Sequence, residues 1–303
     1  MKTNAVKLLS AWFIIGSIFS SCLTDRKGTG ENKITFDSVR VERTVPLLKG
    51  QEEPNCEVQV TYTFPGNYED KVVLQEIQQH FMGIFLEEGE TSDDLAPKQI
   101  IERYADNYIN EYMQLESEYS EGLEMARKLH GNHWSDENSQ EEGADPVAGV
   151  KADYSYYDII SNEITYNAHN LLSYTAEYST YSGGAHGRNV IYNYTLDLTN
   201  GHVLLESDLY VDGYQNELAK LLVAGIAENN GVEDSKALED MGYYSIDEIF
   251  PNGNFYVTDK GAHYSFNEYD IAAYAIGNSE VFIPYEKLRH LLKPGSPVAV
   301  FTE

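Results

Sequence analysis

Polar and apolar residues alternate over two stretches in the first quarter of the chain, residues 34–48 and 56–64. Alternation places every second side chain on the same face, which is typical of half-buried β-strands. The polar segment 49–55 between them predicts a turn. The two stretches are therefore expected to form a pair of strands.

A helical pattern follows the two strands. Apolar residues recur at steps of three and four over residues 73–85, and Asp70 just before them suits an N-cap. A second run begins at Pro97, a residue favoured in the first helical turn, and extends towards Leu129. The acidic, glycine-containing stretch 131–149 predicts an exposed loop.

From residue 154 onward the pattern becomes mostly β. The predicted strands are residues 154–160, 164–169, 171–181, 189–198 and 203–205. Thr199-Asn200-Gly201 predicts a hairpin turn before the last of them. The later predicted elements are a helix at 214–229, a hairpin of 255–258 with 263–266, a strand at 281–284, a helix at 285–292 and a strand at 298–301.

These elements predict an α+β fold in two domains. Residues 33–150 are expected to form a small strand-strand-helix-helix domain. Residues 151–303 are expected to form an antiparallel-sheet domain with helices on one side. An apolar fraction of 42%, with 24 Tyr and 11 Phe, is sufficient for real cores and excludes wholesale disorder.

The N-terminus predicts export from the cytoplasm. Positively charged Lys2 and Lys7 precede an apolar segment, residues 8–19, that is shorter than the roughly 20 residues of a membrane-spanning helix. Ser20-Ser21-Cys22 resembles a bacterial lipobox. Residues 1–21 are therefore interpreted as a signal peptide, Cys22 as the lipidated first residue and residues 22–32 as a tether.

This interpretation places the protein in the bacterial cell envelope, lipid-anchored to a membrane on its periplasmic side or at the cell surface. The alternative is an ordinary cleaved signal peptide with an incidental cysteine. Cys56, the second cysteine, lies in a strand pattern and suits a small buried hydrophobic residue, so no internal disulfide is expected.

The formal net charge of −28 restricts the classes of partner. Such a surface repels nucleic acid and anionic lipid headgroups, and it attracts basic proteins with fast, salt-sensitive association. The alternative role of this charge is solubility alone. Nucleic-acid binding is excluded on this ground.

The densest cluster of conformationally special residues is Tyr181-Ser182-Gly183-Gly184-Ala185-His186-Gly187. Glycines adopt positive φ and allow close backbone approach. His186 can brace the loop, contact a ligand or act as a general base. No nucleophile elbow, phosphate-binding glycine loop or H-E-x-x-H motif accompanies it, so no catalytic residue, metal or cofactor is predicted.

Tyrosines are the other candidate binding feature. Eight of them are expected to give one sheet an aromatic face: Tyr154, Tyr156, Tyr157, Tyr174, Tyr178, Tyr181, Tyr192 and Tyr194. Tyrosine suits protein interfaces and stacking on sugar rings, although it also simply favours strands. The predicted ligand-binding residues are Tyr181, Gly183, Gly184, His186, Tyr192, Tyr194, His263 and Tyr274.

Four segments in order carry a family resemblance. Residues 181–187 resemble the Y-x-G-G-A-H-G motif of the extracytoplasmic domain of the lysozyme-sensing anti-sigma factor RsiV and its relatives. Residues 194–201 resemble that family's strand ending in D-L-x-T-G, residues 269–277 its Y-E-I-A-P-Y-A-x-G, and residues 281–288 its I-P-Y-x-x-L. Ala273 replaces the usual proline. The N-terminal element order resembles the small domain that precedes it in RsiV and in the peptidoglycan deacetylase PdaC.

The resemblance implies a non-catalytic binding domain for lysozyme, another basic protein or a peptidoglycan glycan. The rival hypothesis is a peptidoglycan-modifying hydrolase or deacetylase-like enzyme centred on His186. A third is a structural accessory of an envelope complex. The sequence favours binding over catalysis.

Overall fold

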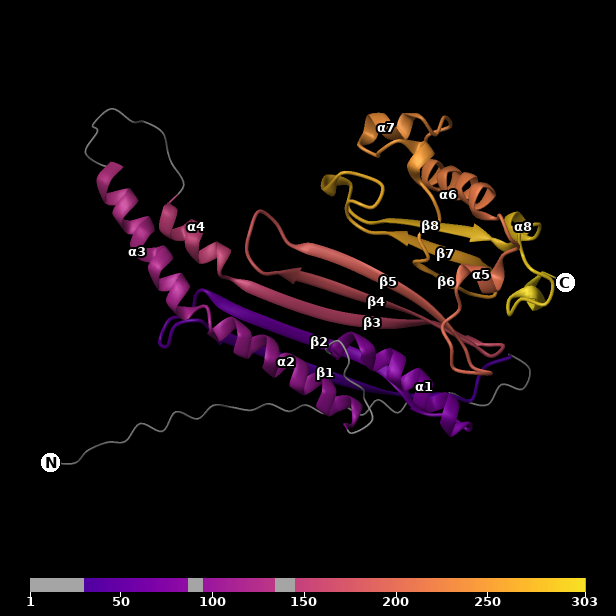
Figure 1. Ribbon diagram of the computed structural model, residues 1–303, viewed down its shortest axis with the longest axis horizontal. Coiled ribbons are helices and arrows are strands. Elements are labelled where there is room, and N and C mark those ends of the chain that lie inside the picture. The colour runs from indigo at the N-terminus through magenta and orange to yellow at the C-terminus, as the bar shows by residue number, and fades with distance from the viewer. Residues whose placement is uncertain (1–29, 87–94, 134–144, 303) are drawn as a thin grey trace.

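The chain folds into two sheets with separate helical layers. The structure is a computed structural model that describes residues 30–86, 95–133 and 145–302. The predicted signal peptide, Cys22 and most of the predicted tether lie outside the described residues. The fold is α+β, as predicted, with a five-stranded sheet covered by helices on one face and a three-stranded sheet beside it (Figure 1).

The five-stranded sheet follows the order of the chain. Its strands are β1 (Thr35–Pro46), β2 (Asn55–Asn67), β3 (Tyr156–Ala168), β4 (Leu171–Tyr181) and β5 (Arg188–Asp197). All neighbours are antiparallel except β2 and β3, which pair in parallel. The sheet therefore continues across residue 150, where the predicted domain boundary lies. β3 is one strand with a register shift between Ile164 and Tyr166, where the sequence predicted two strands.

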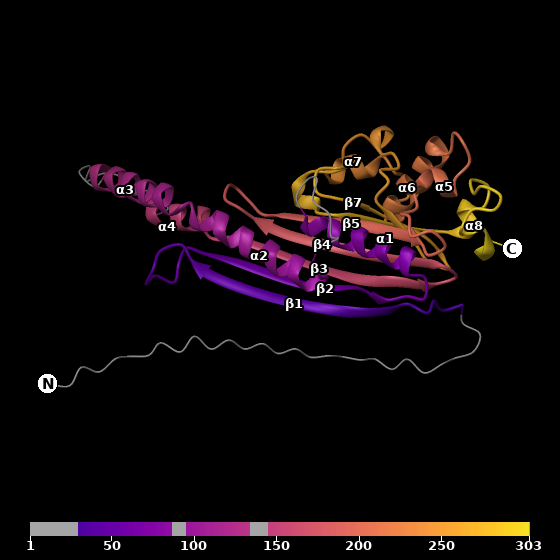
Figure 2. The same ribbon diagram turned by 60° about the horizontal axis from the view of Figure 1, so that its bottom comes forward.

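The chain between β2 and β3 forms helices, of which the first two α-helices lie over one face of this sheet and the last two extend past its end (Figure 2). The helical elements are α1 (Lys71–Met82), the 3₁₀ turn η1 (Gly83–Phe85), α2 (Pro97–Met113), α3 (Glu116–His133) and α4 (Pro146–Asp153). Asp70 caps α1 as predicted, because its Oδ1 accepts from the backbone N–H groups of Val72 and Val73. Among the described residues, no helix has the length and apolar character needed to cross a bilayer.

Two expectations for this helical region were wrong. The run after Pro97 forms two helices: α2 ends at Met113, with Gln114 as its C-cap, and α3 begins at Glu116. The last part of the predicted loop 131–149 is α4. The helix begins here because the side chain of Asp145 caps it by accepting from Val147 N–H, and because Pro146 is favoured at the first helical position.

The second half of the chain builds the three-stranded sheet and its helices. These elements are α5 (Glu206–Leu209), α6 (Gln215–Asn229), α7 (Ala237–Met241), η2 (Ile246–Glu248), β6 (Phe255–Val257), β7 (Gly261–Phe266), η3 (Tyr274–Ile276), β8 (Ser279–Pro284), α8 (Tyr285–Leu288) and η4 (Ala299–Phe301). The predicted strand 298–301 is the 3₁₀ turn η4. Phe301 stacks on Tyr285 with ring centroids 5.6 Å apart, so its apolar character serves packing without strand pairing.

Two hydrophobic cores result. The first lies between the sheet and α1 and α2, and it draws buried residues from all five strands, from both sides of residue 150. Cys56 is buried in it, as predicted. The second lies between the three-stranded sheet, α6 and α8.

Polar groups join the two sheets. The hydroxyl of Ser173 on β4 donates to the carbonyl of Val257 on β6 at 2.6 Å, and Val257 N–H donates to Thr195 Oγ1 at 3.0 Å. Asn254 occupies the edge of β5, where its Oδ1 accepts from Asn193 N–H at 2.8 Å and its Nδ2 donates to Ile191 O at 2.8 Å. This edge strand is therefore covered by side chains instead of another strand.

We expect Asn254→Ala to lower the free energy of unfolding by about 2 kcal/mol, because it leaves backbone groups of β5 without partners. Urea denaturation measures this. Asn229→Ala, which removes a single exposed hydrogen bond to Glu280 O, is the matched control and should cost less than about 1 kcal/mol. Equal losses for the two variants would contradict the role assigned to Asn254.

Candidate functional site

The glycine loop, residues 182–187, connects β4 to β5 and lies directly against two other elements. Gly183 and Gly184 have φ of 93° and 96°, a region that favours glycine. A Cβ on Gly183 would approach the backbone oxygen of Asp153 at 3.0 Å, and one on Gly187 would clash with the hydroxyl of Tyr157. These glycines therefore let the loop pack on the end of α4 and on β3.

His186 is held by a backbone carbonyl and a tyrosine. Its Nδ1 lies 2.9 Å from Gly187 O, which can only accept, so Nδ1 carries the proton and donates. Nε2 then accepts from the hydroxyl of Tyr269 at 3.1 Å. The imidazole also stacks on Tyr274, with ring centroids 3.8 Å apart. We call His186, Tyr269 and Tyr274 the aromatic cluster.

Tyr269 is the member of this cluster that sequence reasoning did not single out. Its φ is +69°, an uncommon conformation for a bulky side chain, and its side chain is 53% exposed. The surrounding loop is fixed to β5, because Asn267 Oδ1 accepts from Ile191 N–H at 2.7 Å and Glu268 accepts from the Asn189 side chain. Strain at an exposed residue that the fold holds in place is typical of functional sites.

The geometry suits recognition better than bond-breaking. Both ring nitrogens of His186 are engaged, one by a backbone carbonyl and the other by Tyr269. Tyr274 reinforces the arrangement by donating from its hydroxyl to Gly187 O at 3.1 Å. Within the described ranges, no group of three or more His, Cys, Asp or Glu side chains is placed to hold a metal ion. The aromatic cluster can offer stacking faces and hydroxyl hydrogen bonds to a ligand.

The predicted binding residues do not form one surface. Tyr181 lies on the other wall of the glycine loop, where its hydroxyl donates to Gly184 O at 2.8 Å. Tyr192 and Tyr194 share a side, as predicted, but that side faces the helices: Tyr194 lies against His80, with ring centroids 4.6 Å apart. His263 is on β7 between Tyr256 and Phe282, with different ring partners from those of His186.

The expected single aromatic face is likewise divided. Strand register pairs Tyr194 with Tyr174 on the helix side and Tyr157 with Tyr181 on the opposite side. Tyr174 is fully buried under α1, where it stacks on Phe81 at 4.0 Å. The tyrosines of the helix side therefore include core residues as well as Tyr192, which is 41% exposed, whereas Tyr157 and Tyr181 at the glycine loop are half-buried.

A cleft of about 650 Å³ opens beside the glycine loop, and we call it the loop cleft. It is lined by Glu53, Lys151, Ser155, Tyr157, Tyr181, Ala185 and Gly187, together with Ala148 and Ala152 of α4. The sequence did not reveal it, because its walls come from three separated segments. The loop cleft and the aromatic cluster share Gly187, which lines the cleft and whose carbonyl accepts from His186 and Tyr274.

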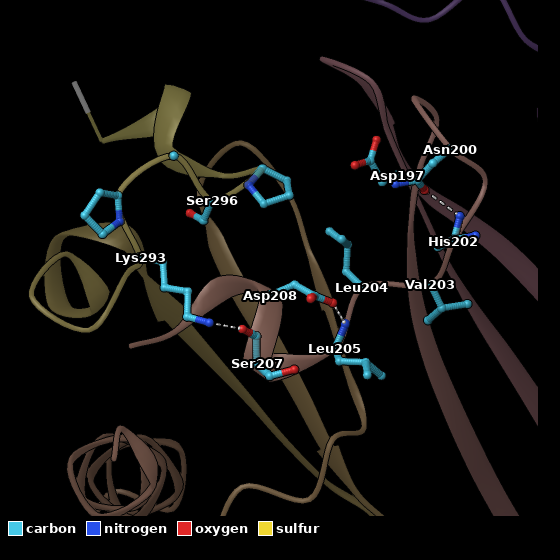
Figure 3. A pocket seen from close by; sticks show the side chains of 13 residues that line it. Asp197, Asn200, His202, Val203, Leu204, Leu205, Ser207, Asp208, Lys293 and Ser296 are labelled. Carbon is cyan, nitrogen blue, oxygen red and sulfur yellow. Dashed lines mark hydrogen bonds between the residues drawn. The ribbon is translucent and has the colours of Figure 1, made fainter. Parts of the chain in front are cut away.

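A second cleft, of about 560 Å³, lies at the opposite end of β5 (Figure 3). Its charged groups make local hydrogen bonds: Lys293 Nζ donates to Ser207 O at 2.7 Å, and Asp208 accepts from Leu205 N–H at 2.8 Å. These bonds hold the chain segments that form the cleft. The sequence did not single out this cleft either.

Comparison with known proteins identifies a domain family. Residues 207–286 match the family model described as Protein of unknown function (DUF3298). A member of the DUF3298 family from Bacteroides fragilis NCTC 9343 is 28% identical, with a TM-score of 0.74 over 90% of this chain and 98% of that chain. No curated protein matches the sequence.

A DUF3298 family protein from Pseudomonas aeruginosa PAO1 is similar in fold, at 14% identity and a TM-score of 0.54 over 87% of this chain and 96% of that chain. The more specific resemblance to RsiV and PdaC stays a prediction. Tyr269 and Tyr274 fall within the matched residues, and the glycine loop precedes them. The chain therefore contains a DUF3298 domain at residues 207–286.

Proposed function

We propose that this protein is a non-catalytic binding protein of the bacterial envelope that captures a basic protein through the aromatic cluster. The observation that carries the proposal is the exposed, strained Tyr269, held against His186 and Tyr274 by hydrogen bonds and stacking. Side chains fixed before binding lose little entropy when a partner docks. Exposed aromatic residues of this kind often dominate the energy of protein interfaces.

Charge favours a basic partner. The chain has a formal charge of −28, and the loop that carries Tyr269 also carries Glu268 and Asp270. Opposite charges accelerate encounter and select against acidic competitors. Lysozyme is the basic protein that the resemblance to the RsiV family suggests.

The position of Gly30, which follows the predicted lipid anchor in the sequence, suits display of the aromatic cluster away from the membrane. Gly30 accepts from His169 N–H at the turn between β3 and β4, at the end of β4 opposite the glycine loop. Strand β4 has eleven residues, so its two ends are roughly 35 Å apart. In this proposal Cys22 carries the lipid in the envelope, and the aromatic cluster is displayed away from the membrane.

We expect the protein to bind lysozyme in surface plasmon resonance, with affinity that falls as salt rises because screening weakens the attraction. Tyr269→Ala is expected to weaken binding by about tenfold, since it removes an exposed aromatic contact. Phe250→Ala removes a comparably exposed aromatic side chain outside the aromatic cluster, 47% exposed, and should leave the affinity unchanged.

Other outcomes would replace the proposal. Absence of a lysozyme response, with muropeptide binding that depends on Tyr269, would identify a glycan as the ligand. Muropeptide products of altered mass that disappear in His186→Ala would favour the peptidoglycan-modifying enzyme. A stable complex recovered by pull-down, without either ligand, would favour a structural accessory.

A further inference from the structure

The loop cleft has an aromatic wall that the aromatic cluster does not use. Tyr157 of β3 and Tyr181 of β4 lie with ring planes 26° apart and centroids 6.0 Å apart. The hydroxyl of Tyr181 donates to Gly184 O, and that of Tyr157 lies against Gly187, so the loop holds both rings in position. The two rings therefore form a wall that is fixed before any ligand arrives.

Two carboxylates lie near this wall, those of Glu53 and Asp153. Glu53 lines the loop cleft from the turn between β1 and β2. Asp153 ends α4, and its backbone oxygen faces Gly183. The C-terminus of a helix carries partial negative charge, which favours cations. Burial, together with the nearby Asp153 carboxylate, raises the pKa of Tyr181. Among the residues that line the loop cleft, Glu53 is the one anion and Lys151 the one cation at neutral pH.

We infer that the loop cleft receives an arginine side chain of the partner, stacked on Tyr157 and Tyr181 and paired with Glu53. The planar guanidinium stacks on aromatic faces and donates hydrogen bonds to a carboxylate at the same time. An anionic group would be repelled by Glu53 and by the C-terminal end of α4. The inference rests on the proposed function, because it assigns the anchoring residue of a basic protein partner.

The position of the cleft suits a single partner. The loop cleft and the aromatic cluster both lie against the glycine loop, because Gly187 lines the cleft and its carbonyl accepts from Tyr274. A volume of about 650 Å³ accommodates the side chain together with part of the segment that carries it. A protein that docks on Tyr269 can therefore insert a neighbouring arginine into the loop cleft.

A short peptide tests the inference without lysozyme. Acetyl-Arg-Arg-Arg-amide is titrated into the full chain and followed by NMR chemical-shift changes, with the citrulline analogue as a neutral match of the same shape. We expect the arginine peptide to bind at least tenfold more tightly than the citrulline peptide, because only the former carries the charge.

Two substitutions in the cleft should act in opposite directions. Glu53→Gln is expected to weaken binding of the arginine peptide roughly threefold, and Lys151→Gln to strengthen it roughly threefold, because one removes an attractive charge and the other a repulsive one. Glu31→Gln and Lys293→Gln change the net charge equally at the opposite end of the sheet and should have no effect.

The inference is overturned if both peptides bind equally, if neither binds, or if the remote variants act as strongly as those in the cleft. Its failure is distinguishable from that of the proposed function. Lysozyme binding that depends on Tyr269 but not on Glu53 or Lys151 would remove the arginine site and keep the function. Arginine-peptide binding in the cleft without lysozyme binding would keep the site and remove lysozyme as partner.

Discussion

Phe81→Ala is expected to lower the free energy of unfolding by about 3–5 kcal/mol, the largest effect among the substitutions considered. Phe81 lies on α1, is fully buried, and stacks on Tyr174 with ring centroids 4.0 Å apart. It also meets Tyr62 edge to face at 6.3 Å. Removing the ring leaves a cavity between α1 and the five-stranded sheet, which rigid strands cannot close.

Urea denaturation at neutral pH measures this loss. The matched control is Phe250→Ala, which truncates an exposed phenylalanine and should change the free energy of unfolding by less than about 0.5 kcal/mol. A loss below about 1 kcal/mol for Phe81→Ala would show that α1 does not form the cover of the first core.

Acidification is expected to destabilise the protein through His80. Burial lowers the pKa of this histidine from 6.5 to about 4. Its Nε2 is buried without a hydrogen-bond partner among the described residues, and its ring lies against Tyr174 and Tyr194. Between pH 6.5 and 4, His80 binds a proton in the unfolded chain but stays neutral in the folded chain. Stability therefore falls over this window by about 3 kcal/mol and levels off below it.

The contribution of His80 is isolated by comparison with His80→Phe, which keeps an aromatic ring but does not titrate. Free energies of unfolding are measured for both proteins at pH 7 and pH 4. The wild type should lose about 3 kcal/mol more than the variant over this interval. Equal losses would mean that carboxyl groups alone cause the acid sensitivity.

Local periodicity identified most of the secondary structure. Strand β4 has the predicted bounds, and α1 begins after Asp70 because that side chain satisfies two backbone N–H groups at the helix start. Errors fell where the pattern is short or interrupted. The bulge at Ile164 and Tyr166 interrupts the alternation of β3 and resembled a gap between two strands.

Strand neighbours were not predictable in the same way. Alternation tells which face of a strand is buried but not which strand lies beside it. β2 pairs in parallel with β3, although about ninety residues that include α1 to α4 separate them. A parallel pair needs a long connection of this kind. The pairing extends one sheet across the predicted boundary at residue 150.

The candidate site was half visible in the sequence. Gly183, Gly184 and His186 stood out because glycine-rich segments have special conformations and histidine has special chemistry. Tyr269 did not stand out, because a tyrosine gives no indication in the sequence of the positive φ that it adopts in the structure. In the sequence, Lys151 and Glu53 look like any other surface charges. The structure distinguishes them from the other charged residues because both line the loop cleft.

The sequence by itself determined the α+β class, most strand and helix positions, the acidic surface and the unusual glycine loop, because these follow from composition and from neighbours along the chain. Tertiary structure alone decided which tyrosines are core and which are surface, since strand register assigns each to a face. It also brought Tyr269 and Tyr274 to His186 across more than eighty residues. Such contacts depend on long-range packing, which no local pattern encodes.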